Sequence, residues 1–98
     1  MTIPVTAYIF NETILKTVNE IGGVYCLLQH NPGTHFGILY VGLSENLRRR
    51  LFEHLNNPPI RGITHFHVEA ISGAMARSMR EQYLIREFNP PGNVHHTR

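Results

Sequence analysis

The chain has 98 residues and 42% of them are apolar, which predicts one small globular domain and excludes an intrinsically disordered protein. Its single cysteine, Cys26, excludes an internal disulfide framework and a multi-cysteine zinc site. The single cysteine also fits a reducing cytoplasm, where we expect the protein. No run of about 18 apolar residues occurs, and no basic segment precedes an apolar one at the N-terminus, so we expect no membrane span and no secretory signal. The net charge of +2 is small, yet eight of the nine basic residues are arginine, the side chain best suited to grip a phosphate. A GC-rich genome would produce the same bias.

Residues 11–21 predict a short helix that covers one side of a sheet, after a possible extended segment at residues 6–10. Asn11 is a suitable N-cap, and Phe10 and Leu15 have the spacing of a hydrophobic staple. Two glycines, Gly22 and Gly23, end the helix. The expected apolar face consists of Ile14, Leu15, Val18 and Ile21.

Residues 24–30 and 36–42 are rich in apolar and aromatic side chains, and the turn signal at residues 31–34 lies between them. Together they predict an antiparallel hairpin. If Pro32 and Gly33 form a two-residue tip, Tyr25 lies opposite Tyr40. A longer loop or a bulge would shift this register. The two tyrosines are either packing residues or part of a site beside the neighbouring glycines.

Residues 40–55 predict the end of a strand, a tight glycine turn and an arginine-rich helix, with Ser44 as a plausible N-cap. Leu47, Leu51 and Leu55 recur every four residues and form one helical face. Arg50 and His54 fall on the edge of that face, which would bring them close to Tyr40. A guanidinium, an imidazole and a phenol that converge beside a glycine turn suit a phosphate. The alternative is a solvated basic helix with a histidine at its boundary.

Residues 56–62 predict a loop, and residues 64–71 predict a half-buried third strand because apolar and polar side chains alternate along it. His65, His67 and Glu69 share the polar face, where they would suit a transition metal. Such a row is more often the wet face of a sheet.

Residues 72–88 predict the last helix, which Pro90 and Pro91 prevent from continuing. Glu81 shares a face with apolar side chains, where a carboxylate is costly unless it is paired or bound to a metal. A salt bridge to Arg77 is one interpretation. The other is a metal ligand, since Mg²⁺ commonly takes one or two carboxylates and completes its shell with water and phosphate.

Taken together, the residues resemble the GIY-YIG endonuclease family. The two naming motifs are Gly23-Val24-Tyr25 and Tyr40-Val41-Gly42, each with valine in place of isoleucine. Arg50 follows Gly42 by eight residues and His54 follows by four more, at the family's spacing for an essential arginine and a frequent histidine. Glu81 precedes a proline-rich segment that ends at Asn93, with Asn89 as the rival asparagine.

The resemblance implies an α+β fold, in which a three-stranded antiparallel sheet is flanked by helices. It also implies hydrolysis of a DNA phosphodiester with one divalent metal, Mg²⁺ or Mn²⁺. Tyr25 would orient or deprotonate the attacking water, and Tyr40 would assist through hydrogen bonds. Arg50 would stabilise the pentacovalent phosphate, and His54 would contact phosphate or relay a proton. By the same resemblance, Glu81 would bind the metal and Asn93 would support the site.

The resemblance spans residues 22–93, so residues 1–21 are expected as an N-terminal extension and residues 94–98 as a tail. We expect Arg48, Arg49 and Arg61 to contact nucleic acid. Target choice would come from this small surface, from a homo-oligomer or from a separate DNA-targeting partner. Two other functions stay open. One is a nucleic-acid-binding module on the same fold that does not cut, and the other is a metal- or protein-binding adaptor that uses the histidine strand.

Overall fold

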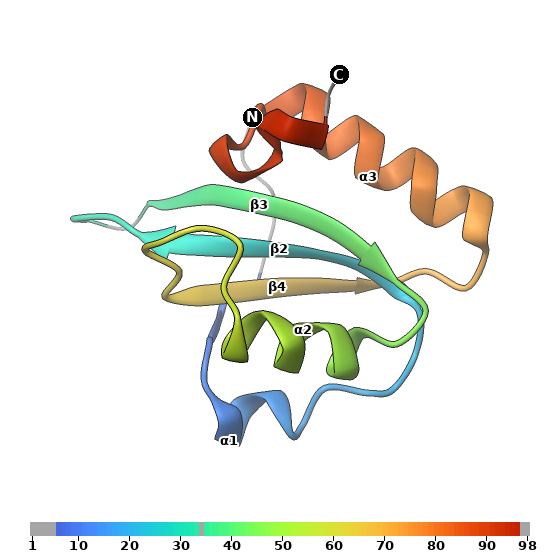
Figure 1. Cartoon of the computed structure of the whole chain (residues 1–98), viewed down its shortest axis with the longest axis horizontal. Helices are drawn as coiled ribbons and strands as arrows, with labels where there is room; N and C mark the ends of the chain where they lie inside the picture. The colour runs from blue at the N-terminus through green and yellow to red at the C-terminus, as the bar shows by residue number, and fades with distance from the viewer. Residues whose placement is uncertain (1–5, 34, 97–98) are drawn as a thin grey trace.

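The computed structural model describes residues 6–33 and 35–96, the last three by their backbone alone. A four-stranded antiparallel sheet has helices on both faces (Figure 1). The strand order is β1-β4-β2-β3. The strands are β1 (Tyr8–Ile9), β2 (Gly23–His30), β3 (Phe36–Ser44) and β4 (His65–Ala70). The helices are α1 (Glu12–Leu15), α2 (Leu47–Asn56), α3 (Ala74–Phe88) and the 3₁₀ helix η1 (Pro91–His96).

The expected α+β class is confirmed, but the sheet has four strands and not three. The additional strand is β1, in which Tyr8 pairs with Phe66 and Ile9 with His65 of β4. This strand lies within the extended segment expected at residues 6–10, but it is only two residues long, which is too short for an alternating pattern to predict its pairing with the sheet. Across the described residues, no helix is long and apolar enough to cross a membrane.

The sheet separates two apolar cores. On one face, Tyr25, Leu27 and Tyr40 pack with Leu15 of α1 and Leu51 of α2. On the other face, side chains of β2 and β3 pack against α3, and this second core consists of Val24, Cys26, Leu28, Val41 and Leu84. Strand β3 is an edge of the sheet.

The hairpin register differs from the expected one by two residues. Tyr25 lies opposite Gly42, and Tyr40 lies opposite Leu27. The hairpin loop is wider than a Pro-Gly tip, because Asn31 N–H donates to the carbonyl oxygen of His35 at 3.0 Å, and the register shifts again after Leu27. A shift of two keeps both phenols on one face, since side chains alternate with a period of two. Their ring centroids are 6.3 Å apart.

The helix boundaries are partly as predicted. Asn11 caps α1, and its Oδ1 accepts from Ile14 N–H at 2.8 Å, but α1 has only four residues. Ile21, expected on the apolar face of this helix, is 44% exposed because the chain leaves the helix before it. The cap of α2 is Asn46 and not Ser44. At the other end of the chain, η1 continues through residue 96, into the segment that was expected as a tail, while residues 97–98 lie outside the described residues.

Candidate active site

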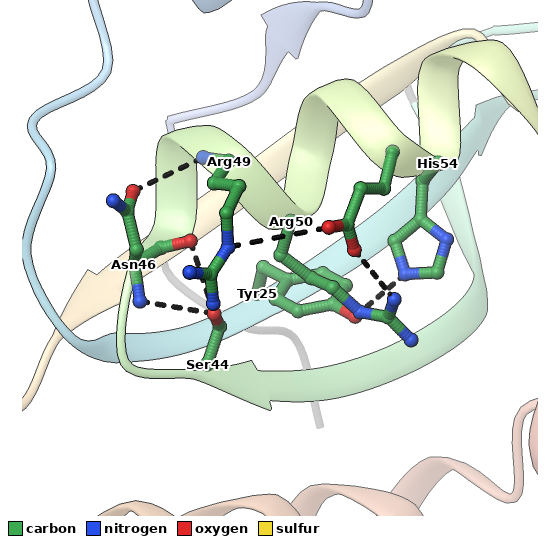
Figure 2. A network of polar contacts seen from close by, with 7 residues as sticks. Tyr25, Ser44, Asn46, Arg49, Arg50 and His54 are labelled. Carbon is green, nitrogen blue, oxygen red and sulfur yellow. Dashed lines mark hydrogen bonds and ion pairs between the residues drawn. The ribbon is translucent and has the colours of Figure 1, made fainter.

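The centre of the candidate site is a hydrogen bond between Tyr25 of β2 and His54 of α2 (Figure 2). Tyr25 Oη lies 2.7 Å from His54 Nε2, and both side chains are buried. Tyr40 of β3 completes an aromatic group, with its ring centroid 5.4 Å from that of His54. A register difference of two residues therefore still brings both phenols and the imidazole together, as the sequence predicted.

The turn between β3 and α2 fixes the angle at which α2 crosses the sheet. Ser44 Oγ accepts from the Asn46 N–H and donates to the Asn46 carbonyl oxygen, both at 3.0 Å. Asn46 Oδ1 then accepts from the Arg49 N–H at 3.1 Å, which satisfies one of the free amides of the first helical turn. Ser44 thus orders the turn, and Asn46, two residues later, caps the helix. Figure 2 shows this turn beside the Tyr25–His54 pair.

The Arg50 side chain extends from α2 toward the Tyr25 phenol, and its guanidinium lies beside the hydroxyl (Figure 2). Its Nη1 donates to Glu53 Oε1 at 2.8 Å, and its guanidinium also interacts with the Tyr25 hydroxyl. The Arg50 side chain is 42% exposed, so one side of the guanidinium faces the phenol while the other stays open to solvent. This placement suits a group that receives a phosphate at the protein surface.

The environment shifts the pKa values of the two hydrogen-bonded groups in opposite directions, and both shifts favour the uncharged form. Burial raises the pKa of Tyr25 well above its ordinary value, and the neighbouring Tyr40 raises it further, whereas Arg50 lowers it. Burial, and then the charge of Arg50, lower the pKa of His54 to about 4. At neutral pH the pair is therefore a phenol and an uncharged imidazole. In the tautomer with an unprotonated Nε2, the phenol donates to the ring.

We predict that His54 makes the fold lose stability as the pH falls. The pKa of His54 is about 4 in the folded chain and about 6.5 when unfolded, so the unfolded state binds the proton first. The stability that neutral His54 contributes is present above about pH 6.5 and is lost as the pH approaches 4. Thermal unfolding at pH 7 and pH 5 should show a smaller drop in Tm for His54→Gln than for wild type. His35→Gln, at an exposed histidine, should behave as wild type. Equal drops in all three proteins would contradict the prediction.

Glu81 lies on the side of α3 that faces the sheet, half-buried between Arg77 and Leu84, which are both buried. Its carboxylate is close enough to Tyr25 to raise the pKa of the phenol, so it belongs to the same electrostatic environment. The Arg77 guanidinium uses one nitrogen, Nη1, to donate to the carbonyl oxygens of Ile71 and Ser72, at 2.9 and 3.0 Å. Arg77 therefore anchors the start of α3 to the end of β4.

Asn93 closes the open edge of β3. Its Nδ2 donates to the Val41 carbonyl oxygen at 2.9 Å, and its Oδ1 accepts from the Val41 N–H at 2.8 Å. The side chain is 2% exposed, and its amide replaces the missing neighbouring strand at that position. Asn89, the rival assignment, is exposed and ends α3 in the left-handed conformation, with φ 45°. Of the two, Asn93 is the asparagine placed to hold β3, between Tyr40 and Gly42.

A pocket of about 650 Å³ opens beside these groups, and we call it the phosphate pocket. Tyr40, Arg50 and His54 line it together with Glu53. The sequence reasoning missed the rest of the lining: Asn56, Asn57, Pro58, Pro59 and Gly92. The only signal for the first four was their place at the end of α2 and directly after it. Gly92 is required because a Cβ there would lie 2.6 Å from the Leu39 carbonyl oxygen.

Gly42 leaves the space in which the Tyr25 ring lies, because a Cβ at this position would overlap the Tyr25 hydroxyl and its ring carbon Cζ. We therefore expect Gly42→Ala to push the phenol away from His54. The expected cost is about 1–3 kcal/mol in the free energy of unfolding, together with roughly a tenfold or greater loss of any catalytic rate that depends on Tyr25.

The matched control for this prediction is Gly73→Ala at the start of α3, where the nearest atom to a new Cβ would be 3.8 Å away. Chemical denaturation and a cleavage assay on both variants test the prediction. An active Gly42→Ala protein with wild-type stability would show that the phenol has room to move.

The three arginines expected to contact nucleic acid have different surroundings. Arg48 donates from Nε to the Val18 carbonyl oxygen at 2.7 Å, which holds the segment after α1 against α2. Arg49 is more exposed, and its Nε lies 4.0 Å from Glu53 Oε2. Arg61 is exposed in the loop that follows α2. Arg49 and Arg61 are the two with side chains directed to solvent, and the nucleic-acid contacts stay predictions.

The histidine strand has a structural explanation. Glu69 pairs with Arg80 of α3, with Arg80 Nε 2.8 Å from Glu69 Oε1, and its other oxygen lies 3.2 Å from His67 Nε2. The polar face of β4 is therefore partly covered by α3 and is not a wet face. Among the side chains that the structure describes, no group of three histidine, cysteine or acidic residues is placed to hold a metal ion.

Comparison with known proteins identifies solved structures with the same fold. No family model matches the sequence, and no curated protein matches it. Solved structures do match, and among them are crystal structures of the GIY-YIG N-terminal endonuclease domain of UvrC from Thermotoga maritima. One point-mutant form, bound to its catalytic divalent cation, superposes with a TM-score of 0.69 at 20% identity, over 84% of this chain and 93% of that chain.

The magnesium-bound form of the same UvrC domain gives a TM-score of 0.67 at 22% identity, with 84% of this chain and 93% of that chain covered. The chain therefore has the fold of the GIY-YIG endonuclease domains.

Proposed function

We propose that this protein is a metal-dependent endonuclease that hydrolyses DNA phosphodiester bonds at the phosphate pocket. The observation that carries the proposal is the convergence of three side chains from two elements: Tyr25 Oη lies 2.7 Å from His54 Nε2, and the Arg50 guanidinium interacts with the same hydroxyl. A guanidinium aimed at developing negative charge, beside a proton-accepting pair, is a main tool for phosphoryl chemistry. The UvrC domain that shares this fold is an endonuclease domain, which supports the same reaction class.

In this proposal Arg50 holds the reacting phosphate. Its guanidinium is already oriented by Glu53 and by Tyr25, and a phosphate oxygen would compete with Glu53 for the same nitrogen. Charge-assisted hydrogen bonds of a guanidinium to phosphate strengthen as the phosphate gains negative charge in the transition state. Tyr40 lines the same pocket and adds a phenol on its β3 side.

Tyr25 and His54 would move the proton of the attacking water. A phenol with a raised pKa is a poor base alone, but Tyr25 donates its proton to neutral His54 as it accepts one from water. The water oxygen then bonds to phosphorus, the bond from phosphorus to the leaving deoxyribose oxygen breaks, and that oxygen takes a proton from solvent. His54, uncharged at neutral pH, is available as the acceptor.

Glu81 would hold the divalent cation, Mg²⁺ or Mn²⁺. The fit is favourable because a half-buried carboxylate that acts electrostatically on the Tyr25 phenol is the hard oxygen ligand that such a cation prefers. The magnesium-bound UvrC domain supports this choice of ion. When bound, the cation supplies Lewis-acid stabilisation of the phosphate. Asn93 supports the site indirectly, because its bonds to Val41 fix the strand that carries Tyr40.

The test is a supercoiled-plasmid assay with Mg²⁺, with Mn²⁺, and with chelator, beside a DNA-binding isotherm at fixed salt. Metal-dependent conversion to nicked or linear plasmid, abolished by chelator, is the expected result. DNA binding without cleavage by any divalent ion would favour the non-catalytic module on the same fold. Size-exclusion chromatography of the active protein would show whether it is a homo-oligomer.

A further inference from the structure

A second pocket adjoins the phosphate pocket on the far side of the loop that follows α2. We call it the loop pocket; Phe10, Leu55, Ile60 and Ile63 supply its apolar walls, and Arg61 stands at its side. Pro58 and Pro59 line both pockets. Pro58 and Pro59 thus lie between the loop pocket and the groups around Arg50 and His54, and the two pockets are neighbours.

The lining of the loop pocket is complementary to a planar, neutral ring with a phosphate attached. Apart from Arg61, its lining residues have no polar side chain, and they include the aromatic Phe10; there is no carboxylate among the described lining residues. Its single charge is the guanidinium of Arg61. Nucleobases stack on aromatic and guanidinium planes whatever their sequence, and arginine also binds the backbone phosphate.

The loop that carries these residues has restricted conformations. Pro58 and Pro59 have fixed φ angles. Gly62 has φ 94°, and a Cβ there would lie 2.6 Å from Gln29 Nε2, so the loop lies directly against β2. The backbone after it is held by Thr64 N–H, which donates to the Leu28 carbonyl oxygen at 2.9 Å. A rigid wall of this kind keeps the pocket open without a ligand, which favours binding.

We propose that the loop pocket receives a nucleobase next to the scissile phosphate, so that the preferred substrate is DNA with an unpaired nucleotide at that position. This inference rests on the proposed function, since it takes the phosphate pocket as the place of cleavage. The loop pocket has a volume of about 580 Å³, inside the range of about 300–1,000 Å³ for pockets that bury small ligands.

An unpaired nucleotide is required because a paired base is not available to such a pocket. Bases of a duplex are stacked and present only their edges in the grooves. A base that fills a pocket beside the backbone must leave the stack, and the free energy of leaving is lowest for a mismatched, damaged or already single-stranded nucleotide. DNA that has this defect before binding would therefore bind more tightly than a perfect duplex.

The experiment compares two fluorescent oligonucleotides, a matched duplex and the same duplex with one unpaired central nucleotide, by anisotropy in the presence of chelator. Wild type should bind the second roughly ten to a hundred times more tightly. Ile60→Trp, which fills the pocket, should reduce this ratio to less than about three while duplex affinity changes little. Arg61→Ala, at an exposed position, should also reduce the ratio to less than about three, in addition to a modest loss of affinity for both oligonucleotides that follows from the loss of one charge. Arg86→Ala, which removes the same charge from an exposed position of α3, should keep the wild-type ratio.

The outcomes separate the inference from the proposed function. Equal affinity of wild type for both oligonucleotides would overturn the loop-pocket proposal even if plasmid DNA is cleaved. If Arg61→Ala and a folded Ile60→Trp both kept the wild-type affinity ratio, the loop-pocket proposal would also be overturned. A clear preference that both variants lose would support the pocket even if no divalent ion gave cleavage, in which case only the proposed reaction would fail. Circular dichroism melting of Ile60→Trp identifies an unfolded variant, and Arg61→Ala then decides.

Discussion

Replacement of Glu81 by glutamine is expected to abolish metal-dependent cleavage while the protein stays folded and bound to DNA. Glutamine keeps the shape of the side chain and removes the charge, so a divalent cation would bind weakly and the charge of the transition state would be poorly neutralised. A loss of at least about a thousandfold in rate is expected, which corresponds to about 4 kcal/mol of transition-state stabilisation. Removal of one negative charge near the phosphates should leave DNA affinity unchanged or raise it.

The measurement pairs plasmid-nicking rates over a series of Mg²⁺ concentrations with a DNA-binding isotherm at one salt concentration. Glu87→Gln, the same chemical change at an exposed position of α3, is the matched control and should retain wild-type cleavage. A second readout is the pKa of Tyr25, which Glu81 raises and which should fall in the variant. If Glu81→Gln cut DNA as fast as Glu87→Gln, Glu81 would not be the metal ligand.

The sequence predicted which side chains lie close together better than it predicted the strand register and the helix caps around them. The spacing of four residues between Arg50 and His54 places both on one side of any helix, so their neighbourhood did not depend on where α2 begins. The two tyrosines were predicted to face each other through a register that was wrong by two residues. They still lie on one face, because strand geometry repeats every two residues.

The features that the sequence could not supply depend on contacts between distant segments. The cap at Asn46 in place of Ser44 follows from the turn after β3, where the Ser44 hydroxyl bonds to the Asn46 backbone. Asn93 was expected to support the site, but its pairing with Val41 could not be known without the strand order that leaves β3 at an edge. The pocket linings also required the path of the loop after α2 in three dimensions.

Replacement of Arg50 by lysine is the other change expected to abolish cleavage. Lysine keeps the charge but offers an ammonium on a flexible stem, which does not reproduce the planar, bidentate contact of a guanidinium with phosphate. We expect a loss of roughly a hundredfold to a thousandfold in rate, the range for removal of one transition-state hydrogen-bond donor. DNA affinity should change by much less, since the net charge is the same.

Arg49 provides an unusually close control for this prediction. Both arginines interact with the same carboxylate, because Glu53 lies 2.8 Å from Arg50 Nη1 and 4.0 Å from Arg49 Nε. They differ in surroundings, since only Arg50 interacts with the Tyr25 hydroxyl and lines the phosphate pocket. Arg49→Lys should therefore cut at close to the wild-type rate, and Arg49→Ala should weaken DNA binding modestly and reduce its salt dependence by about one counterion. Equal losses of cleavage for Arg49→Lys and Arg50→Lys would mean that the arginines act as diffuse charge, and that the contact of Arg50 with the buried Tyr25–His54 pair has no part in the reaction.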